Sequence, residues 1–411
     1  MIALHERNFR LYWFGQAISN IGNWMQIVAL GWFILQIGGS ALALGFLGLA
    51  QSLPLFALAL MGGMLADRFP RLKLLMVTQS SAMVLAIVLA VLASLGKPPL
   101  WSLLLVAALA SSVTAIDNPA RQAVLSDLVR KDALLNAVAL NASVYNGAAV
   151  IGPTLAGLLL LKVGAVGCFL LNAVSFLAVL VALLVIVRGQ QASLKKVEEE
   201  QSHNAGAPAT VRSTSRFSYF RDFAILRHER AILAILVVAA ATSLLGRPYL
   251  LLMPAFARNV QQVGPTGLGL MVAASGLGSL FGSIALAMLK SVRWLARLLL
   301  LCGTGFGLGL ILFALVQPLT GALFTLLCCG AGATMTMTVA NTLLQTSAPT
   351  GMRGRVMSLY TLIAAGLTPL GVLLISAVAT VMGLGSATIM AAVGVIIVVL
   401  VGYSQLIAKK A

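Results

Sequence analysis

Apolar segments long enough to cross a lipid bilayer recur along almost the whole chain, and no other feature restricts its fold as strongly. A bilayer core about 30 Å thick is crossed by roughly 20 apolar residues in a helix. Because the segments lack the short alternating pattern of membrane β-strands, we predict an all-α integral membrane protein with twelve transmembrane helices. The predicted helices span residues 11–35, 42–65, 73–95, 100–117, 135–161, 166–187, 231–254, 266–289, 295–316, 319–341, 355–380 and 384–407.

The composition agrees with a membrane protein. Of the 411 residues, 60% are hydrophobic and only 9% are charged, whereas about 25% of the residues of a soluble domain are charged. The first apolar segment is long, contains several amides and ends without a small-residue cleavage site, so we interpret it as a helix and not as a signal peptide. The four cysteines lie within apolar segments without metal-ligand spacing, which predicts packing roles and no metal site.

The distribution of Lys and Arg predicts the orientation. With the N-terminus placed in the cytoplasm, all but four of the 27 basic residues fall in cytoplasmic segments. Lys97, Lys162 and Arg258 fall in outer loops, and Arg247 falls within a predicted helix. The positive-inside rule therefore predicts that both termini are cytoplasmic. The net charge of +17 follows from the same bias and indicates contact with membrane lipids, not nucleic-acid binding.

The helices divide into two related groups of six. Residues 188–230 form the one long polar stretch, which predicts a six-helix half at 1–187, a cytoplasmic linker at 188–230 and a second half at 231–411. The Asn118 and Gln122 pair at the end of the fourth helix recurs as Asn341 and Gln345 at the end of the tenth. Internal repeats of this kind build many transporters, although a duplication that is only structural would look the same. We predict pseudo-symmetric halves.

Two motifs carry more specific chemistry. The turn after the second helix holds Asp67, Arg68 and Arg71, and a helix-end carboxylate followed by an arginine can bridge to a second carboxylate, for which Asp117 is the candidate. The alternative is a simple topology anchor. The fifth helix holds Gly152, Pro153 and Gly157, whose small face permits close helix packing and whose proline bends the helix. Packing alone would also explain these glycines.

Both motifs resemble those of the major facilitator superfamily. The resemblance implies that Asp67, Arg68, Arg71 and Asp117 form a charge latch that closes the cytoplasmic side, and that Gly152, Pro153 and Gly157 belong to the motif of exporting branches. Pro70 departs from the family pattern, which usually has Gly there, and Ala148 and Ala156 replace two glycines. Segments 8–16, 21–26, 117–122 and 353–358 resemble the enterobactin-exporter-like and macrolide-efflux-like branch, so the likeness covers nearly the whole chain.

Polar residues within the predicted helices are candidates for a substrate cavity. Such groups are costly in hydrocarbon unless they face a cavity or another helix, and the resemblance implies that the first, fourth, seventh and tenth helices line the cavity. The alternative is hydrogen bonding between helices without a substrate. The candidates are Gln16, Asn20, Asn23, Trp24, Gln51, Ser112, Arg247, Thr338 and Asn341.

Arg247 is the one charge clearly inside a predicted helix, and two interpretations of it stay open. It either meets an anionic or catechol-bearing substrate or extends to the outer membrane interface. No carboxylate lies at the middle of any predicted helix, so the sequence itself gives proton coupling little support.

The sequence has no nucleotide-binding loop and no catalytic cluster, so we predict that the protein is not an enzyme and needs no cofactor. The expected function is secondary active export of a small amphiphilic molecule, a siderophore or a drug. The resemblance implies alternating access in the bacterial inner membrane, driven by the proton gradient, and we expect a monomer. The alternatives are an importer, a lysolipid-type flippase, and a membrane scaffold or sensor that does not transport.

Overall fold

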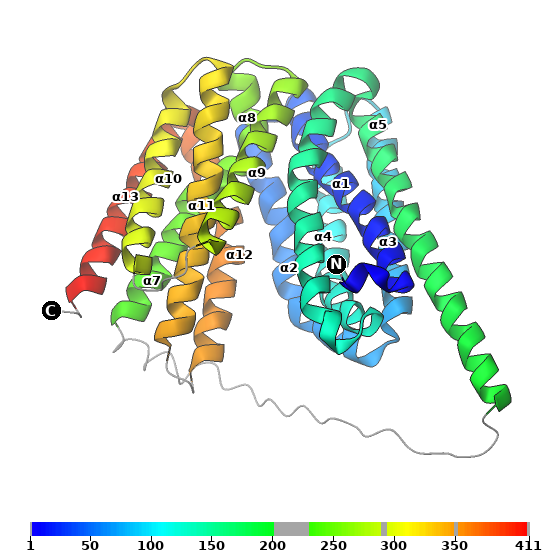
Figure 1. Ribbon diagram of the computed structural model, residues 1–411. Helices are drawn as coiled ribbons and strands as arrows, with labels where there is room; N and C mark the ends of the chain where they lie inside the picture. Colours follow the sequence, from blue (N-terminus) through cyan, green and yellow to red (C-terminus); the bar gives the residue numbers. More distant parts are fainter. Residues whose placement is uncertain (1, 201–229, 289–293, 349–351, 409–411) are drawn as a thin grey trace.

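The computed structural model describes residues 2–200, 230–288, 294–348 and 352–408, and all regular structure within these ranges is helical. Figure 1 shows two groups of helices side by side. The first half holds α1 (Arg7–Gln36), α2 (Ala41–Arg68), α3 (Arg71–Ser94), α4 (Leu100–Leu128) and α5 (Leu134–Glu200). The second half holds α7 (Arg230–Ala241), α8 (Met253–Ala255), α9 (Pro265–Ala287), α10 (Leu295–Leu315), α11 (Leu319–Ser347), α12 (Arg353–Met382) and α13 (Leu384–Ala408).

Helix α5 crosses the bundle twice. Its apolar part, Asn136–Gly189, has 54 residues and would be about 80 Å long as a straight helix, far more than one crossing needs. Gly164 interrupts it with φ 65° and ψ −172°, a conformation that is open mainly to glycine, and the chain reverses direction there (Figure 1). Eleven helices of the described residues are long and apolar enough to span a membrane. Counting α5 twice gives the predicted twelve crossings.

Several helices extend further than the predicted segments. Helix α4 continues to Leu128, beyond the predicted end at residue 117, and α11 continues to Ser347. Helix α5 continues to Glu200, so the helical part of the first half runs beyond residue 187 into the predicted linker. Hydropathy marks where a helix leaves hydrocarbon, whereas backbone hydrogen bonds continue the helix into water. The rest of the predicted linker, except Arg230, lies outside the described residues.

The seventh membrane helix is irregular, although a continuous helix at 231–254 is predicted. After Ala241 the chain forms a π-helical turn at Thr242–Gly246 and a 3-10 turn at Arg247–Leu250. Pro248 has no backbone N–H to continue the helical ladder. A Cβ at Gly371 of α12 would overlap the Leu244 carbonyl oxygen, so α12 packs directly against this turn. The seventh helix thus presents Arg247 from a distorted segment, as π-turns at functional sites often do.

The helices of the second half are held together by glycine contacts. A Cβ at Gly330 of α11 would overlap the Ser275 carbonyl oxygen, and a Cβ at Gly278 of α9 would overlap the Leu327 carbonyl oxygen. Close backbone approach of this kind drives helix association in lipid, where the hydrophobic effect is absent. Gly305 of α10, by contrast, has open space where its Cβ would be.

We therefore expect Gly330→Ala to lower the thermal unfolding midpoint of the detergent-purified protein, since overpacking costs about 1–3 kcal/mol. Gly305→Ala is the matched control and should leave the midpoint unchanged within error. Equal midpoints for the two variants would contradict the glycine contact between α9 and α11. The measurement is unfolding followed by intrinsic fluorescence on heating.

A gated cavity between the two halves

Small residues bring the two halves into contact at one end of the molecule. We call the end at which α7 begins the linker end and the opposite end the distal end. A Cβ at Gly157 of α5 would lie 2.8 Å from the Pro265 carbonyl oxygen, and a Cβ at Gly269 of α9 would lie 2.6 Å from the Pro153 carbonyl oxygen. The Thr266 hydroxyl donates to the Gly157 carbonyl at 3.3 Å. We call this contact between α5 and α9 the distal seal.

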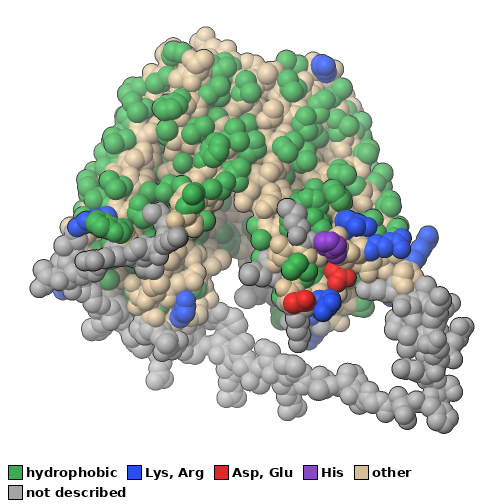
Figure 2. Space-filling model, viewed as in Figure 1, with side chains coloured by type: hydrophobic (Ala, Val, Ile, Leu, Met, Phe, Trp, Pro, Cys, Tyr) green, Lys and Arg blue, Asp and Glu red, His purple; other side chains and the backbone are tan. Residues whose placement is uncertain are grey.

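A second contact joins α2 to α12 on the other side of the interface. A Cβ at Gly45 would lie 3.0 Å from the Leu373 Cα, and one at Gly366 would lie 3.1 Å from the Phe56 ring. Gly45 and Leu373 lie in the distal parts of their helices, whereas Phe56 and Gly366 lie near the middles. Toward the linker end the halves separate, and Figure 2 shows a hollow between them that opens at that end. The structure is therefore closed at the distal end and open at the linker end.

The predicted export motif lies in this closed region. Gly152 faces α1, where a Cβ would lie 2.8 Å from the Ile21 carbonyl oxygen, whereas Gly157 faces the other half through the distal seal. Pro153 supplies the carbonyl oxygen against which Gly269 packs. The three residues thus join α5 to α1 on one face and to α9 on the other. The link between this motif and export stays a prediction.

A buried charge cluster lies near the linker end of the first half. Asp117 of α4 is 5% exposed and accepts hydrogen bonds from the Thr78 hydroxyl at 2.6 Å and the Gln79 amide at 2.8 Å. The Arg121 guanidinium donates to Asp117 through Nε and to the Gln16 side-chain oxygen through Nη1. The cluster therefore joins α1, α3 and α4 through one carboxylate.

In this structure, which is open at the linker end, Arg71 is not paired with Asp117, the partner that the sequence predicts for a closed cytoplasmic side. Arg71 instead donates to both carboxylate oxygens of Asp127, at 2.8 and 2.9 Å, in a half-exposed pair. Asp117 lies on the same face of α4 as Arg121, one helical turn away, so the local pair forms in place of the one between helices. Arg68 is exposed, and the Asp67 side chain lies outside the described part of the structure. The latch as a closing device stays a prediction.

The structure brings together three of the predicted cavity residues, Trp24, Arg247 and Asn341, with two tyrosines. The Trp24 and Tyr145 rings meet edge to face, with centroids 5.9 Å apart. The Arg247 guanidinium lies within electrostatic range of the Tyr145 hydroxyl in the opposite half and of the Tyr360 hydroxyl in its own half. The Tyr360 hydroxyl donates to the Met337 carbonyl at 2.8 Å, one turn before Asn341 on α11, and the Asn341 side-chain oxygen accepts from the Gln345 amide. We call these five residues the Arg247 cluster.

Two observations bear on the interpretations of Arg247. A guanidinium that extended to the membrane interface would lie at the rim of the bundle. Arg247 is half-buried, and its charge acts on tyrosine hydroxyls of α5 and α12. Both favour the interior over the membrane interface, and contact with a substrate stays a prediction.

The other residues that were predicted to line the cavity lie outside the Arg247 cluster. Gln16 belongs to the charge cluster around Asp117, and Asn23 accepts from Asn172 at 3.4 Å in a network between α1 and α5. The Ser112 hydroxyl donates to the Ala108 carbonyl of its own helix at 2.9 Å. Asn20 and Gln51 are half-buried and Thr338 is exposed, and within the described residues none of their side chains forms a hydrogen bond. For Gln16 and Asn23, hydrogen bonding between helices is the better interpretation.

Sequence reasoning missed five residues of these clusters, because Thr78 and Gln79 beside Asp117 were not predicted either. Tyr145 and Tyr360 are single aromatics in apolar helices, so nothing local distinguishes them from packing residues. Arg121 carries a usable signal, because an aspartate four residues earlier on a helix is the spacing of an ion pair.

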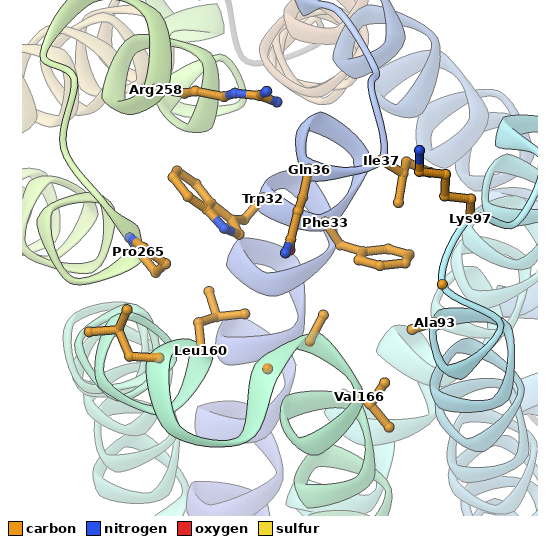
Figure 3. Close-up of a pocket in the computed structure, with 14 residues that line it drawn as sticks. Trp32, Phe33, Gln36, Ile37, Ala93, Lys97, Leu160, Val166, Arg258 and Pro265 are labelled. Carbon is orange, nitrogen blue, oxygen red and sulfur yellow. The ribbon is translucent and has the colours of Figure 1, made fainter.

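A separate pocket of about 750 Å³ lies at the distal end, where α1 and α5 meet the second half. Figure 3 shows Trp32 and Gln36 near its centre, with Arg258 and Lys97 on opposite sides. Arg258 also donates to the Leu35 carbonyl of α1. The pocket lining contains two cations and no acidic residue.

Twelve apolar crossings in two halves, with a hollow open at one end and a seal at the other, define a multi-pass transporter of the major facilitator type. The family described as "transmembrane secretion effector" matches residues 2–410, and the chain belongs to it. Its relatives include siderophore transporters and drug-efflux pumps, so the protein is an efflux-type transporter and not an enzyme.

Individual similarities are distant but cover almost the full chain. The chain is 25% identical to the staphyloferrin A transporter of Staphylococcus aureus (strain NCTC 8325 / PS 47) over 89% of its own length and 87% of that protein. It is 24% identical to macrolide efflux protein A of Streptococcus pyogenes over 89% and 88%. A bacterial homologue of the iron transporter ferroportin, solved in an inward-facing state, has the same fold, with a TM-score of 0.71, 18% identity and coverage of 98% of both chains.

The buried charge cluster leads to a stability prediction. Asp117→Ala leaves the Arg121 guanidinium without its carboxylate, and breaking a buried pair costs about 3–5 kcal/mol. We expect a large drop in the unfolding midpoint in detergent. The double variant Asp117→Leu/Arg121→Met removes both charges and should recover most of the loss.

Asp127→Ala is the control, because it removes the half-exposed pair with Arg71, whose contribution should be about 0–1 kcal/mol. Midpoints that fall equally for Asp117→Ala and Asp127→Ala would show that the cluster is no more important than a surface pair.

Proposed function

We propose that the protein exports a small amphiphilic molecule, a siderophore or a drug, across the bacterial inner membrane by alternating access. The observation that carries this proposal is the combination of a closed distal end and a hollow open at the linker end, with the Arg247 cluster between the halves. A site reached from one side at a time is what alternating access requires. The siderophore and macrolide relatives support the substrate range.

The charge distribution supports the placement of the linker end in the cytoplasm. On the face shown in Figure 2, the basic side chains gather mainly around the linker end, together with the acidic side chains that are visible there. This is the bias of the positive-inside rule. With that orientation both termini are cytoplasmic, and the hollow collects substrate from inside the cell. Export then requires the distal seal to open and the linker end to close.

We also propose that the proton gradient drives the cycle. Asp117 is the one carboxylate among the described residues that is buried within the helices. It lies beside the linker-end opening but is paired with Arg121. A protonophore should therefore abolish efflux from energised vesicles that contain ATP, while depletion of ATP with the gradient kept intact should leave efflux unchanged. Efflux that survives the protonophore would show a different energy source.

The distal seal gives a direct test of alternating access. Gly157→Ala puts a Cβ 2.8 Å from the Pro265 carbonyl oxygen, which should cost the sealed state about 1–3 kcal/mol, or about a 5- to 150-fold change in the equilibrium. We expect efflux to fall although the protein still inserts. Gly147→Ala, on the same helix with open space at its Cβ, should transport normally. Loss of efflux in both variants would point to a general defect of α5.

The direction and the substrate are tested in a deletion strain and its complemented parent. Mass spectrometry of medium and cell extracts should show one secreted metabolite that disappears from the medium and accumulates inside the deletion strain. A change in drug susceptibility alone would define a drug-efflux pump. If only uptake or lipid composition changes, the protein is an importer or a lysolipid-type flippase and the export proposal is wrong. No change in any of these would indicate a membrane scaffold or sensor.

A further inference from the structure

We propose that Arg247 selects the substrate by its charge, so that the transported molecule is an anion that also carries an aromatic or similar planar group. This inference rests on the proposed function and narrows its substrate to one chemical class. The relatives include both a siderophore transporter and a macrolide pump, so the family alone does not choose between anionic and cationic substrates.

The first observation is that Arg247 has no charged partner among the residues that the structure describes. Within the described ranges, the structure gives its guanidinium no hydrogen bond and no ion pair. A half-buried cation between membrane helices is costly when it is unpaired. Asp117, the buried carboxylate of the described residues, is already neutralised by Arg121. An anionic ligand would supply the missing partner, and the planar guanidinium matches the geometry of a carboxylate or catecholate.

The second observation is an aromatic surface beside this charge. Tyr145 is 56% exposed, and its ring packs on Trp24 of its own half. Ala149, one turn further along the same face of α5, packs against α9 of the other half, where a Cβ at Gly276 would lie 3.0 Å from the Ala149 carbonyl oxygen. The exposed part of the ring therefore faces the space between the halves. A planar group could pack against Tyr145 and Trp24 while its anionic group reaches Arg247. A ligand bound in this way contacts both halves. It would lose one of its two contacts if Arg247 and Tyr145 moved apart.

The third observation is the charge of the distal pocket. Its lining carries Lys97 and Arg258 and has no acidic residue. All ten acidic residues of the chain lie at position 6, between 67 and 132, or between 198 and 229, and those described in these ranges belong to the linker-end part of the first half. A cationic drug would find no carboxylate in this pocket, whereas an anion would find favourable charge both there and at Arg247.

The experiment uses three probes of one shape: 2-naphthoate, the neutral 2-naphthamide and the cationic 2-naphthylmethylammonium. Each is titrated calorimetrically into the full-length protein in nanodiscs at pH 7, with empty nanodiscs subtracted. We expect 2-naphthoate to bind about 10- to 100-fold more tightly than the other two, as a charge-assisted contact provides. Arg247→Met should remove this preference, and Arg247→Lys should retain part of it. Lys162→Gln, which removes an exposed distal cation outside the pocket, should bind as the wild type does.

The outcomes separate this inference from the proposed function. Equal affinity for the three probes, preferred binding of the cation, or an anion preference unchanged in Arg247→Met would overturn the assignment to Arg247. In those cases the comparison of the deletion strain with its complemented parent would still test the proposed export independently. If the strain shows no export while 2-naphthoate binds in an Arg247-dependent way, the site holds anions but the proposed export is wrong. Thermal unfolding of each variant confirms that the titrated protein is folded.

Discussion

The structure depends on a constraint that the bilayer imposes on the backbone. Hydrocarbon offers no hydrogen-bond partners, so every spanning segment forms a helix that satisfies its own N–H and C=O groups. Association of those helices then rests on close packing. Glycine supplies that packing at two levels in this chain. Gly278 and Gly330 join helices within one half, whereas Gly157 and Gly269 join the two halves at a contact that the proposed alternating access would break. The same chemistry thus serves contacts within a half and contacts between the halves.

The two interior arginines solve the problem of a buried charge in opposite ways. Arg121 donates to a carboxylate oxygen and to a glutamine oxygen, and these two contacts join α1 to α4. Arg247 lies between the halves beside aromatic rings and, in the described structure, has no such network. A charge with hydrogen-bond partners inside the protein stabilises the packing of the helices. A charge without such partners in the described structure is available to a ligand. The distorted backbone around Pro248, packed against Gly371, holds Arg247 in that half-buried position.

The sequence was sufficient for the helices but not for the contacts between them. Hydropathy located all twelve crossings, because each needs about 20 apolar residues. Hydropathy predicted that α4 ends at residue 117, whereas the helix continues to Leu128, because its last turns lie beyond the apolar segment. The sequence did not indicate Asp127 as the partner of Arg71 in this open state, because Asp117 and Asp127 lie almost three turns apart on one helix, and only the packing of α3 against α4 decides which is in reach. Arg247 was found as a charge in an apolar segment, but Tyr145 required the fold.

The unpaired charge of Arg247 has an electrical consequence. A unit charge that crosses the whole membrane potential changes energy by about 2.3 kcal/mol per 100 mV. If the two halves rock around Arg247, the empty carrier moves part of a positive charge through this field, whereas a carrier loaded with a monovalent anion moves almost none. The return of the empty protein, and not the loaded step, would then set how the turnover rate responds to voltage. One side chain would thus couple the resting potential of the cell to the pace of the cycle.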